Sequence, residues 1–179
     1  VEDGVKIKPY ESDALFAGIS IDTDGFQSKS GPRTFEAVAF LRRHGADITR
    51  VRKMLRDDMK GYIAVAQAVS HAVVYKGAFA ISVFDGEGLD SPTIGGAKAA
   101  NQLLDISGIK ASFVVTAYND VIYVSARSID EVNVQIIMER LGGGGHMNIA
   151  GAQLKDITPQ RAISIVKDTI NQMIEEGAI

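Results

Sequence analysis

The residues best suited to chemistry form one stretch, in which four consecutive glycines, Gly142 to Gly145, precede His146. Four glycines cost backbone entropy on folding, and a single one would suffice to end a helix, so packing alone is a weak reason for them. Successive glycines let main-chain N–H groups approach an anion and form a concave nest. An adjacent imidazole can donate a hydrogen bond to a phosphate or bind a metal. The alternative is a flexible loop that ends a helix and carries an incidental His.

This stretch matches neither of the familiar nucleotide-binding loops. A P-loop requires Lys followed by Ser or Thr after its last glycine, where this chain has His146 and Met147. The dinucleotide fingerprint requires a further spaced glycine, and Met147 and Asn148 do not supply it. If this stretch binds a phosphate, it must therefore do so through contacts other than those of a P-loop or a dinucleotide-binding loop.

A second candidate pair, Ser125 and Arg127, lies at the end of an apolar run that predicts a strand. Polar side chains at a strand end are free to face a cleft. The planar guanidinium of Arg suits a phosphate or stacking on a base. The alternative is a surface Arg followed by a helix cap at Ser128.

A third candidate, Asp22 with its neighbour Asp24, follows the short apolar run 14–21. We expect this run to be a helix end followed by a short buried strand, with the acidic residues emerging at the strand's carboxyl end, where open α/β sheets place ligands. A carboxylate there can bind Mn²⁺ or Mg²⁺. A simple turn or cap is the alternative, because one Asp pair cannot hold two metals and the sequence shows no other ligand cluster.

The amino-acid composition limits the classes of protein to which the chain can belong. The chain has 179 residues, of which 46% are hydrophobic and 23% charged, as in an ordinary globular protein. A net charge of −3 argues against broad binding to nucleic acid or a membrane surface, and the absence of Cys excludes disulfides and thiolate sites. Because the chain opens on Val1 rather than Met, we expect it to be a piece of a longer protein.

The elements that must position these residues alternate between helices and strands, which predicts an α/β or α+β fold with a mixed sheet, and of these we favour α/β. Thr34 is expected to cap the first of three helices, and Tyr118-Asn119-Asp120 to join two strands in a hairpin. A second unit is expected to begin near Val73. The expected helices are 34–44, 47–55, 59–71, 92–104, 132–141 and 159–175, and the expected strands are 78–84, 111–117, 121–126 and a short one near 153–154.

Several ordered stretches together resemble the DHH phosphoesterase superfamily with its DHH-associated substrate domain. More narrowly, they resemble the membrane-anchored bacterial cyclic di-AMP phosphodiesterases. The resemblance covers nearly the whole chain from about Tyr10. The stretches that carry it are Gly18–Phe26, Arg33–Ala37, Leu41–Asp47, Ser125–Ser128, Asn133–Gln135 and Gly142–His146.

The resemblance implies a division into three parts and a set of site residues. Residues 1–58 would be the C-terminal part of a DHH α/β lobe, 59–72 a linker helix, and 73–179 the mixed-sheet substrate-binding lobe. Asp22 is implied as a manganese ligand and Asp24 as its neighbour, with the other ligands of a two-metal site expected upstream. The implied substrate-binding residues are Ser125, Arg127, Gly143, Gly144, Gly145 and His146, and Asn133 and Asn148 are further candidates.

The implied function is Mn²⁺-dependent hydrolysis of cyclic di-AMP to linear diadenylate by the parent protein, with this piece alone inactive. Two alternatives stay open: a nanoRNase that trims short linear oligonucleotides, and a nucleotide- or RNA-binding module without catalysis. The implied partner is a cyclic dinucleotide or short oligonucleotide, and a homodimer is left open. The resemblance places this part in the cytoplasm, without membrane contact of its own, and anchors the parent in the bacterial cell membrane.

Overall fold

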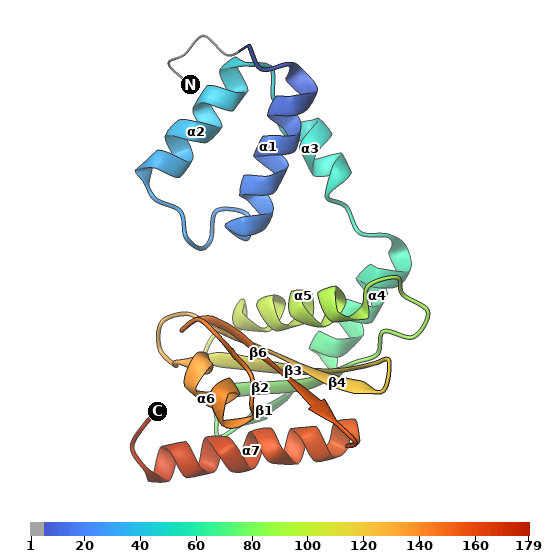
Figure 1. The fold of residues 1–179 in the computed structure, drawn as a ribbon, viewed down its shortest axis with the longest axis vertical. Helices are drawn as coiled ribbons and strands as arrows, with labels where there is room; N and C mark the ends of the chain where they lie inside the picture. The colour runs from blue at the N-terminus through green and yellow to red at the C-terminus, as the bar shows by residue number, and fades with distance from the viewer. Residues whose placement is uncertain (1–5) are drawn as a thin grey trace. The chain divides into compact units, whose positions relative to one another are not determined.

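A computed structural model describes residues 6–179, and the chain divides into two compact units between Asp57 and Asp58 (Figure 1). The first unit contains the helices α1 (Pro9–Asp22), α2 (Pro32–Arg43) and α3 (Ile48–Met54). The second contains the helices α4 (Met59–Ser70), α5 (Pro92–Leu104), α6 (Val134–Arg140) and α7 (Pro159–Glu175) together with all strands of the described residues.

The first unit is held together by a small core and one buried carboxylate. Phe16 of α1, Leu41 of α2 and Val51 of α3 are buried against one another. Asp13 of α1 accepts a hydrogen bond from Nε of Arg50 at 2.6 Å and from the backbone N–H of Asp47 at 2.7 Å. The hydrogen bond from Arg50 holds the pKa of Asp13 below its ordinary value, so the carboxylate stays charged and joins α1 to α3.

Two expectations for this unit are wrong. The run 14–21 contains no strand but lies inside α1, which begins with Pro9 in its first turn, where Glu11 accepts a hydrogen bond from the backbone N–H of Lys8. A short apolar run does not distinguish a strand from a helix by its pattern alone. The residue that precedes α2 is Gly31 rather than Thr34, because Pro32 already occupies the first helical turn.

The second unit is built on a six-stranded sheet in the order β1-β2-β3-β4-β6-β5. Only β2 and β3 pair in parallel, and the other neighbours are antiparallel. This arrangement confirms the predicted α/β class with a mixed sheet. The strands are β1 (Val73–Tyr75), β2 (Phe79–Phe84), β3 (Ala111–Tyr118), β4 (Val121–Ser128), β5 (Gly144–Gly145) and β6 (Ile149–Lys155).

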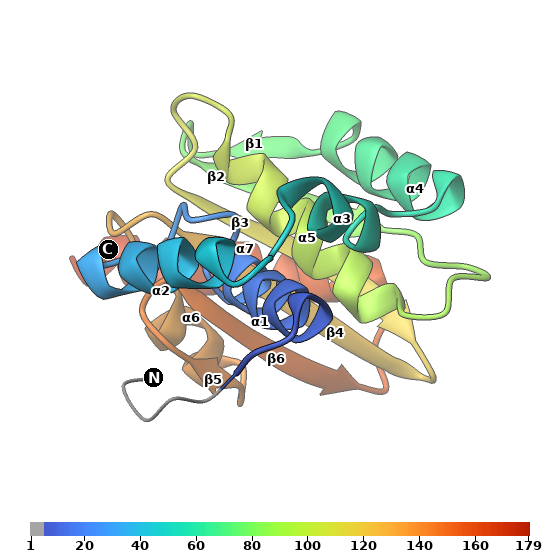
Figure 2. The same cartoon turned by 90° about the horizontal axis from the view of Figure 1, so that it is seen from above.

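Helices cover both faces of this sheet (Figures 1 and 2). On the side that we call the α5 face, α4 and α5 bury Ala80, Phe84 and Val114. On the opposite side, the α7 face, α6 and α7 cover the larger core. Through Val65 and Ala68, α4 belongs to the α5-face core, so the helix that we expected to act as a linker lies within the second unit.

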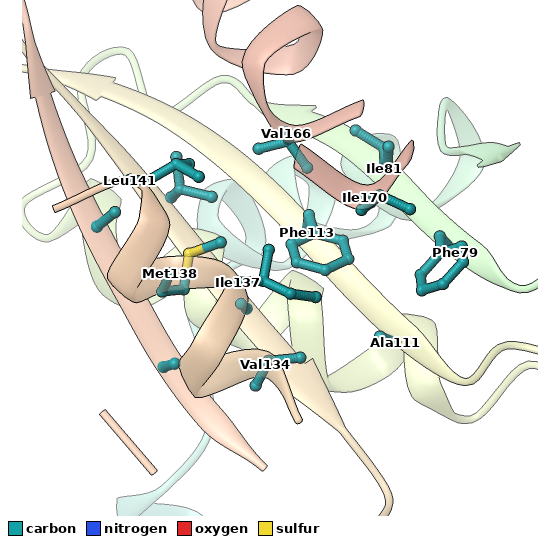
Figure 3. Close-up of a cluster of buried hydrophobic side chains, with 14 of the residues drawn as sticks. Phe79, Ile81, Ala111, Phe113, Val134, Ile137, Met138, Leu141, Val166 and Ile170 are labelled. Carbon is teal, nitrogen blue, oxygen red and sulfur yellow. The ribbon is translucent and has the colours of Figure 1, made fainter. Parts of the chain in front are cut away.

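The α7-face core fixes the position of the central strand β3 (Figure 3). Phe113 is fully buried and lies between Ile137 of α6 and Val166 and Ile170 of α7. Because successive strand residues point to opposite faces, burying Phe113 here places Ser112 and Val114 on the α5 face. The register of the sheet is therefore set by helices on both sides.

Several helices and turns begin or end at the residues that the sequence predicts. Pro92 and Pro159 lie in the first turns of α5 and α7, and Thr158 caps α7 by accepting from the N–H of Arg161. The hairpin between β3 and β4 turns through Asn119 and Asp120, which both have positive φ. Three features differ from expectation: β1 and β5 are additional short strands, the strand near 153–154 extends over Ile149–Lys155, and α6 begins at Val134.

Candidate functional site

The part of the α5 face that β4 and β6 form carries polar side chains at alternate positions along the strands. Tyr123, Ser125 and Arg127 alternate along β4, and the residues between them belong to the α7-face core. Across the sheet, Ser125 pairs with Gly151 of β6, and Gly151 pairs with Gly144 of β5. Strand pairing therefore brings the glycine stretch beside Ser125, as the sequence-based site requires.

A cavity of about 530 Å³ opens over these rows, a volume within the range of small-molecule sites. Its walls come from the start of α5, from β4 and β6, and from the glycine stretch. Side chains that line it are neutral, and several are hydroxyl or amide groups. The lining residues are Thr93, Tyr123, Val124, Ser125, Gly142, Gly143, Gly144, Gly151, Ala152 and Gln153.

The four glycines have different surroundings, and packing explains three of them, contrary to expectation. Gly142 follows α6 with φ +76, the left-handed conformation common after a helix end. A Cβ on Gly143 would collide with the backbone of β6, at 2.7 Å from Cα of Ala152. One on Gly145 would lie 2.5 Å from Cα of Ala150. Gly144 has open space at its Cβ position, as Gly142 has, and it lines the cavity with neither a positive φ nor a close contact that requires glycine.

The glycine stretch is an edge strand rather than the expected open nest. Gly144 and Gly145 form β5 and pair with β6. The N–H of Gly143 donates to the carbonyl of Met138 at 2.8 Å, and the N–H of His146 donates to the carbonyl of Ile149 at 2.7 Å. Two N–H groups of the stretch are thus satisfied within the chain and do not face the cavity as free donors.

The remaining polar candidates of this region lie outside the cavity lining. His146 has an exposed side chain at the turn between β5 and β6. Asn148 donates from Nδ2 to Asp130 at 2.7 Å, while its buried Oδ1 has no protein partner. Asn133 accepts from the N–H of Gln135 and caps α6, which gives it a structural role.

Arg127 is held along the α5 face by a residue that the sequence did not single out. Its Nε donates to Oδ1 of Asn101 of α5 at 2.8 Å, and its Nη1 donates to the carbonyl of Ala126 at 2.9 Å. Asn in the middle of a helix is unfavourable, and this was the available signal for Asn101. Ser128 is buried in β4, so it is not the helix cap considered as an alternative.

Two cavity residues were also missed. Tyr123 stands two residues before Ser125, so the period of a strand could have placed both on one face. Gln153 pairs with Tyr123 across the sheet, and only the register of β4 and β6 reveals this.

Asp22 is the last residue of α1 and is exposed. The adjacent Thr23 is buried; its Oγ1 donates to the carbonyl of Ile19 at 2.7 Å and accepts from the N–H of Phe26 at 3.0 Å. Asp24 follows in an exposed turn with φ +49. Within residues 6–179 no three His, Cys, Asp or Glu side chains come together as a metal site, so Asp22 has no neighbouring ligand set there.

Strands β2 to β6, helices α5 to α7 and the glycine stretch lie within the residues that match the DHHA1 domain family. Residues 76–176 match that family's model, and the chain belongs to the DHHA1 family. Over 175 residues the chain is 42% identical to the cyclic-di-AMP phosphodiesterase GdpP of Geobacillus thermodenitrificans, with 97% of this chain and 26% of that protein covered. It is 41% identical over 154 residues to the cyclic-di-AMP phosphodiesterase PdeA of Listeria monocytogenes, with 86% and 23% covered. The chain thus spans about a quarter of the length of these relatives.

The fold is also found among solved structures. An exopolyphosphatase-related protein from Bacteroides fragilis aligns with a TM-score of 0.80 at 18% identity, over 93% of this chain and 51% of that one. At this identity the likeness shows a shared fold. Among the helices of residues 6–179, none combines the length and the apolar character that crossing a bilayer requires.

Proposed function

We propose that this chain provides the substrate-binding part of a phosphodiesterase that hydrolyses cyclic di-AMP to linear diadenylate. The observation that carries the proposal is the 42% identity, over 97% of the chain, to a protein named as a cyclic-di-AMP phosphodiesterase. The cavity beside the glycine stretch supports it, because it joins the predicted Ser125, Gly143 and Gly144 in one neutral, polar-lined space.

In this proposal the residues have separate tasks. The hydroxyl of Ser125 and the open backbone at Gly144 contact a phosphate, and Arg127, oriented by Asn101, supplies the positive charge. Gly143 and Gly145 allow β5 to approach β6 closely, so they shape the site. The exposed imidazole of His146 lies at the neighbouring turn, where it can donate to a second phosphate oxygen.

A divalent metal is part of the proposal, with Mn²⁺ as the ion and Asp22 as one of its ligands. DHH phosphoesterases are metal-dependent, and a bound divalent metal activates a water and neutralises phosphoryl oxygens. The described residues do not complete a metal site by themselves. We therefore expect the chain alone to bind nucleotide without hydrolysing it. Line broadening by Mn²⁺ of the NMR signals of Thr23 and Asp24, absent in Asp22→Ala, would support the assignment of this ligand.

The setting of the parent protein is proposed from the same relationship. The parent is a membrane-anchored bacterial protein that presents this part to the cytoplasm, where cyclic dinucleotides or short oligonucleotides are its partners. A homodimer is an additional proposal, which analytical ultracentrifugation of the chain would test.

Isothermal titration of the chain with cyclic di-AMP, linear diadenylate and inorganic phosphate, with and without Mn²⁺, tests the proposal. We expect adenine dinucleotides to bind and phosphate alone to bind much more weakly. Arg127→Ala should weaken dinucleotide binding by about 10- to 100-fold, because a hydrogen bond to a charged group contributes about 1.5–3 kcal/mol. Ser125→Ala should have a smaller effect in the same direction.

Arg161→Ala is the matched control, since Arg161 is an exposed arginine on α7, which covers the other face of the sheet. It should bind like the unmodified chain. Binding of cyclic di-AMP that is insensitive to Arg127→Ala, Ser125→Ala and His146→Ala would contradict the site. Failure of the folded chain to bind any adenine dinucleotide would contradict the proposed function.

A further inference from the structure

One end of the cavity carries a pair of side chains to which the proposed phosphate contacts assign no task. Tyr123 of β4 and Gln153 of β6 are direct cross-strand partners on the α5 face, and both line the cavity. Their Cβ atoms lie about 5 Å apart by the geometry of such pairs. Tyr123 is half-buried and Gln153 is exposed. An aromatic ring and an amide therefore stand side by side at the cavity wall.

This pair lies next to the phosphate contacts but is distinct from them. Along β4, Tyr123, Ser125 and Arg127 follow one another at steps of about 6.8 Å, the repeat of alternate strand residues. Arg127 is therefore at one end of this line and Tyr123 at the other. A ligand that places a phosphate at Ser125 extends its next group toward either Arg127 or Tyr123.

The part of the cavity beside Tyr123 and Gln153 is lined by residues without side chains. Gly151, which pairs with Ser125 and lies two residues before Gln153 on β6, carries no side chain, and nothing lies within 4 Å of the Cβ position of Gly144. Thr93, at the start of α5, lines the same cavity. A flat group can enter over these glycines and lie against the ring of Tyr123.

We propose that Tyr123 and Gln153 form a purine-base subsite, in which Tyr123 stacks on the base and Gln153 selects adenine over guanine. The inference rests on the proposed function, because it assumes a nucleotide in this cavity. Aromatic side chains stack on any base, so Tyr123 contributes affinity without choosing the base. The side-chain amide of Gln153 discriminates between adenine and guanine.

The selectivity follows from the hydrogen-bonding groups of the two purines. On the edge that carries N7, adenine presents an N6 donor beside the N7 acceptor, whereas guanine presents two acceptors, O6 and N7. A Gln amide has one carbonyl acceptor and one NH₂ donor. It can pair with both adenine groups at once, but on guanine its carbonyl faces another acceptor.

NMR titration of the full 179-residue chain with cyclic di-AMP and with cyclic di-GMP tests the subsite. We expect cyclic di-AMP to bind about tenfold or more tightly than cyclic di-GMP and to shift the side-chain amide signals of Gln153. Gln153→Leu should weaken cyclic di-AMP about tenfold and leave cyclic di-GMP nearly unchanged. Tyr123→Leu should weaken both ligands by a similar factor, since stacking does not depend on the base.

Gln160→Leu is the matched control, because Gln160 is an exposed glutamine on α7, which covers the α7 face of the sheet. It should leave both affinities unchanged. If the chain binds cyclic di-AMP but Gln153→Leu preserves the ratio of the two affinities, the subsite is wrong and the proposed function stands. If a chain with a native, well-dispersed spectrum binds neither dinucleotide, the proposed function fails and the subsite fails with it.

Discussion

At the residue scale, the neighbours Gly143 and Gly144 differ in what surrounds them. A side chain on Gly143 would strike the backbone of β6, whereas the Cβ position of Gly144 faces open space in the cavity. Identical residues one position apart therefore serve two purposes, close strand packing and access for a ligand. This difference can be tested by the smallest possible change, the addition of a methyl group.

We predict that Gly143→Ala lowers the free energy of unfolding by about 1–3 kcal/mol, the usual cost of overpacking. Gly144→Ala should change it by less than about 0.5 kcal/mol but should weaken dinucleotide binding, because its methyl group projects into the cavity. Urea denaturation followed by circular dichroism, together with calorimetric titration, would measure both effects. Equal loss of stability in the two variants would show that the surroundings of these glycines are not as described.

At the element scale, the two units use different means to hold their helices. In the first unit the buried carboxylate of Asp13 joins α1 to the start of α3. In the second unit α5 packs closely on β3, because Gly96 leaves room for the side chain of Thr116. Thr116 Oγ1 is buried there without a hydrogen-bond partner, whereas the hydroxyl of Ser112 of β3 donates to the carbonyl of Ala100 of α5 at 2.7 Å, so this interface combines close packing with a buried hydrogen bond.

The carboxylate of Asp13 makes the first unit sensitive to acid. Its pKa is lowered in the folded chain, chiefly by the hydrogen bond from Arg50 and then by that from the N–H of Asp47. A lowered pKa contributes stability in full above the ordinary value of 3.8, and this contribution is lost as the pH falls through the lower folded value. We predict that the contacts between α1 and α3 lose stability progressively as the pH falls below about 4.

Asp13→Asn should destabilise the first unit at pH 7 and remove most of this acid dependence, as measured by amide signals of α1 and α3 between pH 7 and pH 2. Glu176→Gln provides a comparison, because Glu176 is an exposed acid in the second unit whose pKa is also lowered, by its hydrogen bond from Arg140. It should leave the acid response of α1 and α3 unchanged. An Asp13→Asn chain with the unmodified acid profile would exclude the proposed role of this carboxylate.

We further predict that Gly96→Ala destabilises the second unit by about 1–3 kcal/mol, because its Cβ would collide with Oγ1 of Thr116 and push α5 from the sheet. Gly61→Ala is a milder comparison, since the nearest atom to its Cβ would be a side-chain oxygen of Asp58 at 3.2 Å. Thermal unfolding of both variants would show which one loses more stability. A Gly96→Ala chain as stable as Gly61→Ala would mean that α5 can shift without cost.

At the scale of the whole molecule, each unit has a hydrophobic core of its own. The first is centred on Phe16 and Leu41 of the three helices, and the second contains the cores on both faces of the sheet. The family match, residues 76–176, falls entirely in the second unit, which also holds the cavity. We expect the two units to unfold in separate steps, so that one transition does not describe the chain.

Phe113→Ala tests this expectation. Removing a fully buried Phe should lower the stability of the second unit by about 3–5 kcal/mol, while the first unit is unaffected. NMR signals of Gly45 in the first unit and Gly108 in the second, followed through a urea titration, would report each unit separately. Simultaneous loss of both signals in the unmodified chain and in the variant would show that the units unfold as one.

The sequence by itself determined the features that depend on neighbours along the chain. Prolines in the first turns marked α5 and α7, and Asn119 with Asp120 marked the hairpin, because capping and turn preferences act within a few residues. Residue type and spacing also singled out Ser125 and the glycine stretch, whose role in binding stays a prediction. Conversely, the helical state of residues 14–21 could not be read from an apolar run that suits a helix or a strand equally well.

The tertiary structure alone decided which of these residues meet. The register of β4, β6 and β5 places Ser125, Gly151 and Gly144 in one row, and sets Gln153 beside Tyr123. It also showed that three of the four glycines have structural causes and that Arg127 is oriented by Asn101. Strand pairing is fixed by side chains that pack from both faces of the sheet and lie far apart in sequence, so no local pattern carries this information.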